Sequence, residues 1–278
     1  MSKNTGKKTI LITGASSGMG KETAKDLIQQ GHTVYCAARR VDQMEELKAL
    51  GGKLLKLDIS VNDDIENCVN QVIEESGRVD VLWNNAGFGL YGSVEETSID
   101  EARYQFEVNL FGLARLTQLI VPQMRKQQSG TIINTSSIGG KIYAPLGSWY
   151  HASKHAVEGF SDSLRLDLEP FGINVVVLEP GAIKTEFPEV MSKQLMQRSG
   201  HGPYKDAAQK IANLSLTESG ENGSGSPASV ISKTIQKIIK SKRPKTRYAA
   251  GKFSTSTLLM RALLTDRMFD FVIKQMVK

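Results

Sequence analysis

Residues 8–20 read KTILITGASSGMG, an apolar run followed by a turn with glycines at positions 14, 18 and 20. The run KTILIT is short, rich in β-branched residues and without strict polar alternation, which is typical of a buried parallel strand. Glycine in the turn allows a tight bend and lets backbone N–H groups at a helix N-terminus approach a pyrophosphate. An ordinary glycine-rich turn would look similar, but the position after the first strand favours a dinucleotide site.

Five more runs of the same kind follow, and segments with helical patterns separate them. The runs are TVYCAA (33–38), KLLKLD (53–58), VDVLWNN (79–85), GTIINTS (130–136) and INVVVLEP (173–180). The helical segments include 20–30, 62–76, 100–127 and 150–170. This alternation predicts an α/β fold of the Rossmann type, a three-layer, doubly wound parallel sheet flanked by helices.

The composition of the 278-residue chain, with 40% hydrophobic and 23% charged residues, is that of a globular protein. No apolar run approaches the roughly 18 residues that span a bilayer, and the N-terminal MSKNTGKK has no apolar signal-peptide segment. Cys36 and Cys68 lack metal-ligand spacing and fit two buried free thiols in a reducing compartment. We therefore expect a cytoplasmic protein with no metal site.

The net charge of +6 is unevenly distributed along the chain. Residues 227–278 hold twelve Lys or Arg and two Asp, so the basic character belongs to the C-terminal fifth. Within it, FSTSTLLMRALLTDRMFDFVIKQMVK (253–278) is apolar and basic and could rest on an anionic membrane surface. We expect instead that this stretch covers a substrate pocket or packs on another subunit, with its lysines solvated. No nucleic-acid partner is expected.

Residues 149–154 read WYHASK, which places Tyr150 and Lys154 one helical turn apart. Side chains at i and i+4 lie on one face of a helix and can reach a common partner. A phenol titrates near ~10, and an ammonium beside it favours the phenolate and lowers the pKa of the phenol. The pair is therefore a candidate acid–base device, although two solvated residues on a helix surface give the same pattern.

Two rows of side chains at i+4 spacing run along this predicted helix. We expect the apolar row to be buried and the row that contains the tyrosine and the lysine to border it. The apolar row is Ala152, Ala156, Phe160, Leu164 and Leu168, and the neighbouring row is Tyr150, Lys154 and Glu158.

Six motifs in order resemble the short-chain dehydrogenase/reductase family, the Tyr-x-x-x-Lys enzymes with an N-terminal Rossmann motif. They are TG-x-x-x-G-x-G (13–20), NNAG (84–87), Asn109 in VNLFG, TSS (135–137), YHASK (150–154) and PGAIKT (180–185). The resemblance covers about residues 8–186. Within the family, GASSGMG, NNAGFG and PGAIKTEF look most similar to the hydroxysteroid dehydrogenase-like branch.

The resemblance implies four catalytic residues: Asn109, Ser137, Tyr150 and Lys154. Tyr150 would protonate a substrate carbonyl, or deprotonate the alcohol in reverse, while the nicotinamide passes a hydride. Lys154 would lower the pKa of the phenol and bind the ribose hydroxyls. Ser137 would hold the substrate oxygen, with Ser136 as the alternative, and Asn109 would support a water that relays protons to Lys154.

The resemblance also implies a set of cofactor-binding residues. Asp58 would receive the adenine amino group, although it could instead be an N-cap or turn carboxylate. Ile183 and Thr185 would engage the carboxamide of the nicotinamide. The set, apart from two arginines, is Gly14, Ser16, Ser17, Gly18, Met19, Gly20, Asp58, Ile59, Asn85, Ala86, Gly87, Tyr150, Lys154, Pro180, Gly181, Ile183 and Thr185.

The end of the second predicted strand indicates which dinucleotide binds. NAD-preferring Rossmann sites generally carry an acidic residue there, which accepts from the ribose 2′-hydroxyl. Here the sequence is VYCAARR, with Arg39 and Arg40 and no carboxylate before Asp42. A guanidinium suits a 2′-phosphate in charge and geometry, so the prediction is NADP(H). Two exposed arginines that begin a helix are the alternative interpretation.

Residues 186–226 are polar, irregular and Gly/Ser-rich toward their end, and in the family this region is a mobile substrate lid. Apolar residues of this lid and of the stretch after NNAG could line an apolar pocket or could pack the lid onto the core. They are Phe187, Met191, Leu195, Met196, Phe88, Leu90 and Tyr91. The expected substrate is a carbonyl or secondary alcohol on a bulky apolar molecule of the steroid, retinoid, lipid or xenobiotic type.

We expect one domain over residues 1–278, with a core at about 8–186, a lid at about 186–226 and a helix/strand/helix extension at about 227–278. Family members are commonly dimers or tetramers, and two copies of the 150–170 helix would make an isologous contact. A non-catalytic nucleotide-sensing protein on the same fold is the alternative function. The complete set of four catalytic residues favours the enzyme.

Overall fold

Seven parallel strands form one sheet in the computed structural model, which describes residues 6–276. The first five residues of MSKNTGKK and the last two of the expected extension lie outside this range. The strand order is β3-β2-β1-β4-β5-β6-β7, and every neighbouring pair is parallel. The strands are β1 (Thr9–Thr13), β2 (Thr33–Ala38), β3 (Lys53–Lys56), β4 (Val81–Asn84), β5 (Gly130–Thr135), β6 (Ile173–Pro180) and β7 (Arg247–Ala250).

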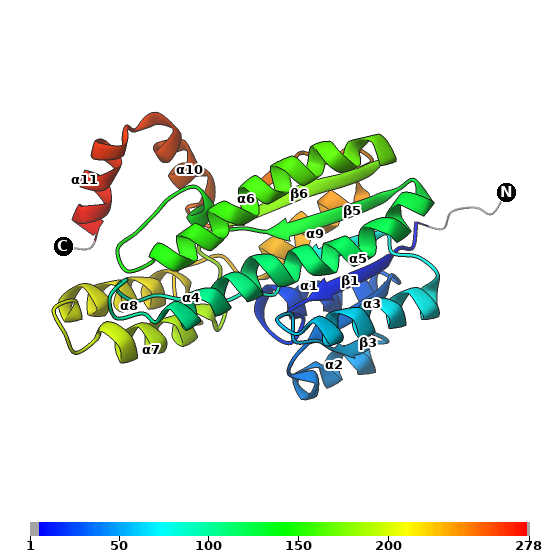
Figure 1. The fold of residues 1–278 in the computed structure, drawn as a ribbon, viewed down its shortest axis with the longest axis horizontal. Helices are drawn as coiled ribbons and strands as arrows, with labels where there is room; N and C mark the ends of the chain where they lie inside the picture. Colours follow the sequence, from blue (N-terminus) through cyan, green and yellow to red (C-terminus); the bar gives the residue numbers. More distant parts are fainter. Residues whose placement is uncertain (1–5, 277–278) are drawn as a thin grey trace.

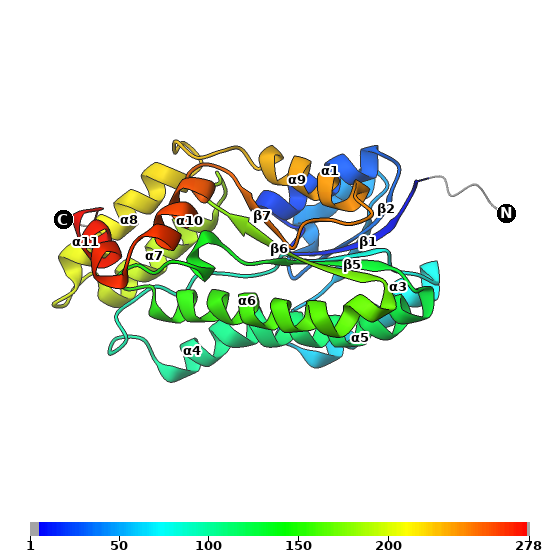
Figure 2. The same ribbon diagram turned by 90° about the horizontal axis from the view of Figure 1, so that it is seen from above.

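Helices cover both faces of the sheet, so the expected doubly wound α/β fold is confirmed (Figure 2). In β1, Ile10 and Ile12 pack on one side and Leu11 on the other, which is why the strand sequence is continuously apolar. The first side carries α1 (Gly18–Gln29), α2 (Glu45–Ala49) and α9 (Ser229–Lys240). The second side carries α3 (Asn62–Ser76), α5 (Gly112–Gln127) and α6 (Ser148–Leu168).

The predicted helix over 100–127 is divided by a π-helical segment. It consists of α4 (Ile99–Phe106), the π-helical residues Glu107–Phe111, and α5. A capping box between Ser98 and Glu101 starts α4. A π-helical turn adds one residue to the ordinary helical repeat and is frequent at functional sites. This one contains Asn109.

We expected the apolar row of α6 to be buried, but the polar row is the buried one. Tyr150, Lys154 and Glu158 are buried, whereas Ala152 is exposed and only Leu168 of the apolar row is buried. The polar row can be buried because its charged groups find hydrogen-bond and ion-pair partners inside the protein, as described below. The apolar row is left partly open on the outer surface of α6.

The lid region is helical, which corrects its description as irregular. It contains α7 (Phe187–Ser199) and α8 (Lys205–Ser219), which pack against each other. Leu195 of α7 is fully buried against Ala208 and Ile211 of α8, and this contact stabilises both helices. The extension ends in two further helices, α10 (Ser254–Leu263) and α11 (Asp266–Met276).

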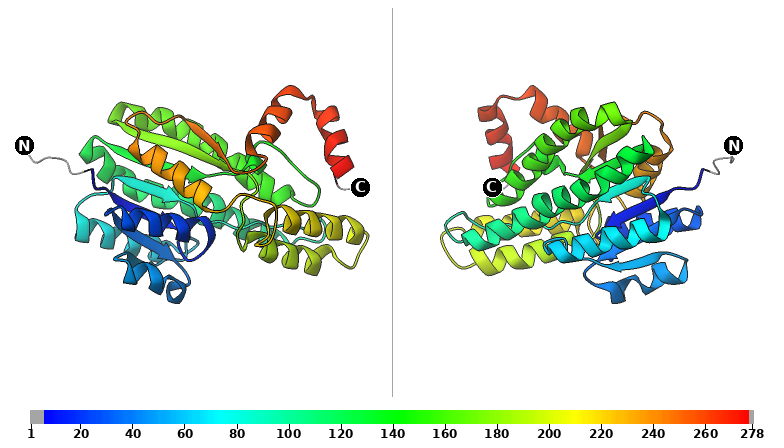
Figure 3. Two further views of the ribbon diagram at one scale, coloured as in Figure 1. Left: turned by 180° about the vertical axis from the view of Figure 1, so that it is seen from behind. Right: turned by 45° about the vertical axis from the view of Figure 1, so that its right-hand side comes forward.

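The lid helices and the C-terminal helices gather at the same end of the sheet (Figures 1 and 3). In Figure 1 the chain enters β1 from the opposite end, so α7, α8, α10 and α11 are at the carboxyl ends of the parallel strands. In open α/β sheets this edge is where ligands bind. The fold therefore places all the later elements of the chain around one candidate site.

Candidate active site

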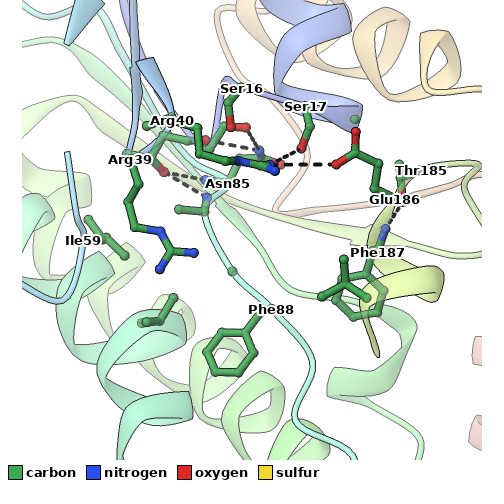
Figure 4. A pocket seen from close by; sticks show the side chains of 18 of the residues that line it. Ser16, Ser17, Arg39, Arg40, Ile59, Asn85, Phe88, Thr185, Glu186 and Phe187 are labelled. Atoms are coloured by element: carbon green, nitrogen blue, oxygen red, sulfur yellow. Dashed lines mark hydrogen bonds and ion pairs between the residues drawn. The ribbon is translucent and has the colours of Figure 1, made fainter. Parts of the chain in front are cut away.

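A cavity of about 330 Å³ lies beyond the carboxyl ends of β1, β2, β3 and β4 (Figure 4). Most of the cofactor-binding residues predicted from the sequence line it. These are Gly14, Ser16, Ser17, Gly18, Met19, Arg39, Arg40, Asp58, Ile59, Asn85, Ala86, Gly87 and Thr185. The remaining members of the predicted set are not in its wall: Gly20, Tyr150, Lys154, Pro180, Gly181 and Ile183.

The glycine turn leaves bare backbone at the N-terminus of α1. Gly14 and Gly18 have φ values of 69° and 52°, a region that favours glycine. A Cβ atom on Gly14 would lie 3.0 Å from the Cα of Ala86, and one on Gly20 would collide with the carbonyl oxygen of Gly14. The first turn of α1 has no acidic residue. The turn therefore fits the pyrophosphate of a dinucleotide.

We expect Gly20→Ala to lower the free energy of unfolding by about 1–3 kcal/mol, because the added methyl group overpacks the turn. It should also weaken dinucleotide binding, since the turn must open to relieve the collision. Gly159→Ala is the matched control, because a Cβ there meets no atom within 4 Å on an exposed face of α6. That change should stabilise the protein by about 0.5–1 kcal/mol. Denaturant titration and NADPH fluorescence measure both effects, and equal stability of the two variants would contradict the argument.

Arg39 and Arg40 stand at the cavity wall beside the end of β2, as Figure 4 shows. The Nη1 atom of Arg39 donates to the hydroxyl of Tyr104 at 3.2 Å. Arg40 donates to Ser17 Oγ at 3.3 Å and pairs with Glu186 at 3.8 Å. Sequence reasoning missed Tyr104 because its contact with Arg39 spans 65 residues and no local pattern marks it.

Asp58 both holds a turn and lines the cavity. Its Oδ1 atom accepts from the backbone N–H of Ser60 at 3.0 Å and from the Ser60 hydroxyl at 2.7 Å. The turn-carboxylate interpretation is thus present in the structure. Because Asp58 also belongs to the cavity wall, the adenine role stays a prediction.

Thr13 is a site residue that sequence reasoning missed. Its hydroxyl oxygen accepts from the backbone N–H groups of both Asn85 and Ala86 at 3.0 Å. The Asn85 side chain returns a hydrogen bond to the Thr13 carbonyl at 3.1 Å. These bonds join the glycine turn to the NNAG loop, so the two walls of the cavity are held together.

Tyr150 and Lys154 are both buried at the base of α6, with 8% and 7% of their surface exposed. Burial raises the pKa of Tyr150, and a hydrogen bond with the Ser137 side chain opposes that rise. The Nζ atom of Lys154 donates to the carbonyl of Thr135 at 2.9 Å, and burial lowers the pKa of this ammonium to about 8. The pKa of Tyr150 is thus raised, not lowered as the sequence predicted, because desolvation is the largest effect on it.

Ser137 and Ser136 have different surroundings. Ser137 is hydrogen-bonded to Tyr150, and its Oγ atom accepts from the Gly139 N–H at 3.0 Å. Ser136 is buried, and its hydroxyl donates to the backbone carbonyl of Lys154 at 3.4 Å. These contacts favour Ser137 as the residue beside the reacting oxygen and give Ser136 a part in holding α6.

Asn109 fixes the loop that leads from β4 to the site. Its Oδ1 atom accepts from the Phe88 N–H, and its Nδ2 atom donates to the Phe88 carbonyl, both at 3.1 Å. Nδ2 also lies 3.1 Å from Ser153 Oγ on α6. A Cβ on Gly87 would lie 3.1 Å from Asn109 Oδ1 and 3.6 Å from Lys154 Nζ. Asn109, Gly87 and Lys154 are therefore brought together.

The loop after β6 contributes Thr185 to the cavity. Thr185 Oγ1 accepts from the Phe187 N–H at 3.3 Å. The residues before Thr185 contact the rest of the fold and not the cavity. The Gly181 N–H donates to the carbonyl of Ala250 at 2.9 Å, and Ile183 is buried in the core. Pro180 closes β6 opposite Ala250.

Aromatic rings pack around the ring of Tyr150. Its ring centroid lies 5.5 Å from that of Tyr91 and 5.9 Å from that of Phe187. Phe187 and Met191 line the cavity, whereas Leu195 packs α7 onto α8. Of the two interpretations left open for the apolar lid residues, each holds for part of the set.

Neither a potential metal-ligand cluster nor a membrane-spanning helix is found among residues 6–276. No group of three or more His, Cys, Asp or Glu is placed there to hold a metal ion. Within the same residues, every helix is too short or too polar to cross a membrane.

Comparison with known proteins agrees with this geometry. A model of the short chain dehydrogenase family matches residues 8–195. The chain is 37% identical over 243 residues to a 3-ketodihydrosphingosine reductase of Bacteroides thetaiotaomicron, with 87% of each protein covered. It is 32% identical over 268 residues to retinol dehydrogenase 8 of Bos taurus, with 92% of this chain and 85% of the relative covered.

Among solved structures, a short-chain dehydrogenase from Streptomyces avermitilis matches with a TM-score of 0.80 at 31% identity, covering 96% of both chains. The finer resemblance to the hydroxysteroid dehydrogenase-like branch stays a prediction, since none of these proteins bears that name. The sequence motifs, the parallel sheet and the matches agree: the chain belongs to the short-chain dehydrogenase/reductase family of oxidoreductases.

Proposed function

We propose that the protein is an NADP(H)-dependent oxidoreductase that interconverts a carbonyl and a secondary alcohol on a bulky apolar substrate. The observation that carries the proposal is that Tyr150, hydrogen-bonded to Ser137, and Lys154 are buried next to two residues of the cavity wall, Phe187 and Gly87. A binding protein has no need of a buried phenol hydrogen-bonded to a serine, so the enzyme is favoured over a nucleotide sensor.

Each residue of the set has a defined task in this proposal. The Tyr150 hydroxyl donates its proton to the substrate carbonyl oxygen in reduction and takes it back in oxidation. Ser137 donates a hydrogen bond to the same oxygen. The Lys154 ammonium stabilises the phenolate that forms and would also bind the ribose hydroxyls of the cofactor. Asn109 holds the loop at Phe88 beside them. The nicotinamide cofactor supplies or accepts the hydride when it is bound.

The choice of NADP(H) rests on Arg39 and Arg40 at the cavity wall. No carboxylate stands at the end of β2, where NAD-preferring sites carry an acidic residue, because Ala38 occupies that position. A 2′-phosphate could accept hydrogen bonds from the two guanidinium groups, of which that of Arg39 is held by Tyr104 and that of Arg40 by Ser17.

An apolar substrate is supported by the rings and aliphatic chains around Tyr150. Phe187, Met191 and Phe88 line the cavity, and Tyr91 stacks near the catalytic ring. The names of the two relatives, a 3-ketodihydrosphingosine reductase and a retinol dehydrogenase, support a lipid or retinoid over a small polar ketone.

A screen of NADPH consumption across ketones and aldehydes of graded size tests the function. We expect turnover to rise with the apolar size of the carbonyl compound, and Tyr150→Phe to nearly abolish it. Tight NADPH binding without turnover of any carbonyl compound or alcohol would instead support the nucleotide-sensing protein.

Contacts between α11 and Tyr143 support a role of the C-terminal helices near the proposed active site. Phe269 of α11 is fully buried and packs at 5.2 Å on Tyr143, whose hydroxyl donates to Asp270 at 2.9 Å. Tyr143 lies between Ser137 and Tyr150 in the chain. Deleting residues 253–278 should therefore raise the KM for substrate, or change the assembly state, more than it reduces binding to anionic vesicles. Strong, salt-sensitive vesicle sedimentation of the intact chain that is lost on deletion would contradict this.

Two further parts of the proposal concern assembly and location. We propose a homodimer or homotetramer built on the partly open apolar row of α6, which a size measurement in solution would test. We also propose a cytoplasmic location, since Cys36 and Cys68 are free and buried, as thiols in a reducing compartment commonly are.

A further inference from the structure

A cluster of buried charges lies behind the catalytic lysine, and the proposed reaction does not use it. Glu158 is one helical turn beyond Lys154 on α6 and is 3% exposed. Its Oε2 atom is 3.0 Å from Lys141 Nζ and 3.0 Å from Arg247 Nη2. Arg247 belongs to β7, so the cluster joins the last strand of the sheet to the catalytic helix.

The contacts of Glu158 are concentrated on one oxygen. Oε2 receives Lys141 and both the Nε and Nη2 atoms of Arg247, whereas Oε1 is buried with no hydrogen-bond partner among residues 6–276. A buried acceptor without a donor is costly and is uncommon in native proteins. Lys141 and Arg247 therefore hold the carboxylate through Oε2 and leave Oε1 unpaired. The negative charge of Glu158 can then act on other groups nearby.

Lys154 is the neighbouring group that a negative charge would stabilise most, because its ammonium is buried. An ammonium that is 93% buried pays a desolvation cost, and its one hydrogen bond here goes to the uncharged carbonyl of Thr135. Residues at i and i+4 of a helix have Cβ atoms about 5–6 Å apart, so Glu158 faces Lys154 along α6. The loop at Gly140 closes this space, since a Cβ there would lie 3.0 Å from the Lys154 carbonyl and 3.1 Å from Glu158 Cγ.

We propose that Glu158 is a positioning residue for Lys154. The buried carboxylate of Glu158, anchored by Lys141 and Arg247, keeps the lysine charged at neutral and mildly alkaline pH. Glu158 raises the pKa of Lys154 against the larger lowering by burial. The other titratable groups within one turn of Lys154 on α6 are Tyr150, His151 and His155. The inference rests on the proposed function, in which Lys154 binds the cofactor ribose as an ammonium.

Two other carboxylates of the cluster are candidates for the same effect and serve as comparisons. Asp162 is one turn beyond Glu158 and pairs with Arg247 and Arg165, both at 2.6 Å. Glu179 on β6 is 3% exposed and lies 3.7 Å from Arg247 Nε. Burial and the nearby Glu158 raise the pKa of Glu179 to about 7. Of these three carboxylates, Glu158 alone raises the pKa of Lys154.

The test is the affinity for NADPH between pH 6 and 10, measured by NADPH fluorescence. In the unmodified protein the affinity should fall as the pH rises through about 8, where Lys154 loses its proton. In Glu158→Gln the fall should begin about one pH unit lower, because an opposite charge at this range shifts a pKa by about 1–3 units. At pH 9 the variant should bind NADPH about tenfold more weakly than the unmodified protein, since one pH unit is a factor of ten.

Matched variants separate this role from a structural one. Glu158→Asp keeps the charge and should keep the pH dependence. Asp162→Asn and Glu179→Gln remove a carboxylate of the same cluster and should leave the midpoint of the NADPH curve unchanged, whatever they do to stability. If Glu158→Gln does not fold, the pair Glu158→Gln, Lys141→Met removes one charge of each sign, leaves Arg247 with Asp162, and should show the same shift.

Lys154→Met distinguishes failure of the inference from failure of the proposed function. This variant should bind NADPH weakly at every pH, with no fall near 8. If it does so and Glu158→Gln follows the unmodified protein, the role of Glu158 is refuted. A shift in Glu179→Gln in place of Glu158→Gln would refute it as well. If Lys154→Met binds NADPH as tightly as the unmodified protein, the cofactor role of Lys154 itself is wrong.

Discussion

Tyr150→Phe should reduce kcat for ketone reduction by about 10²–10⁴-fold, the usual contribution of a general acid. NADPH affinity should stay almost unchanged, because the substitution removes the hydroxyl and keeps the ring. That ring is what packs on Tyr91 and Phe187, at 5.5 and 5.9 Å. Steady-state kinetics with the best ketone of the screen and a fluorescence titration with NADPH measure the two quantities.

Tyr91→Phe is the control for this prediction. Tyr91 belongs to the same aromatic group, and burial raises the pKa of its hydroxyl too, but no contact ties that hydroxyl to Ser137. Its loss should change kcat only slightly. If Tyr150→Phe keeps most of its activity, the acid–base mechanism is wrong and the nucleotide-sensing function gains support.

The cofactor preference should invert in the double variant Ala38→Asp, Arg39→Ala. A charge-assisted hydrogen bond from Arg39 to a 2′-phosphate contributes about 1.5–3 kcal/mol. At about 1.4 kcal/mol per factor of ten, this gives the unmodified protein a roughly 10- to 150-fold preference for NADPH over NADH. Ala38 ends β2 in the cavity wall, so an aspartate there would repel the phosphate and accept from a ribose hydroxyl.

The ratio of kcat/KM for the two cofactors is the readout. Arg39→Ala alone should leave part of the preference, because Arg40 also lines the cavity and is held near Ser17. Arg103→Ala, which removes an exposed arginine paired with Asp100, should change nothing. If the unmodified protein already uses NADH as well as NADPH, Arg39 and Arg40 are surface residues and the NADP(H) prediction is wrong.

The sheet could be predicted from the sequence because its strands are buried on both faces. Burial on both faces makes each strand a continuous apolar run, and glycine turns mark where the first one ends. The lid was harder to predict. Residues 187–219 are polar enough to look irregular, and their helices are stabilised by contacts of α7 with α8, such as Leu195 with Ala208, that local sequence does not reveal.

The candidate site shows the same division between local and distant information. The motifs predict which residues meet, and the structure brings Gly14, Asn85 and Arg39 to one cavity. The surroundings of the α6 polar row could not be predicted, because Thr135, Lys141 and Arg247 reach it from three other segments. The burial of Tyr150 also depends on distant segments. The sequence therefore predicted a lowered pKa for Tyr150, whereas burial raises it.

The pairing of Arg247 with Glu158 joins residues that are 89 positions apart, and β7 completes the edge of the sheet beside β6. Arg247 is therefore synthesised well after α6, and contacts between distant residues slow folding. Before β7 is in place, Glu158 and Glu179 lack the guanidinium that pairs with them in the folded protein. We therefore expect α6 to be held less firmly in a fragment that ends before β7 than in the intact protein.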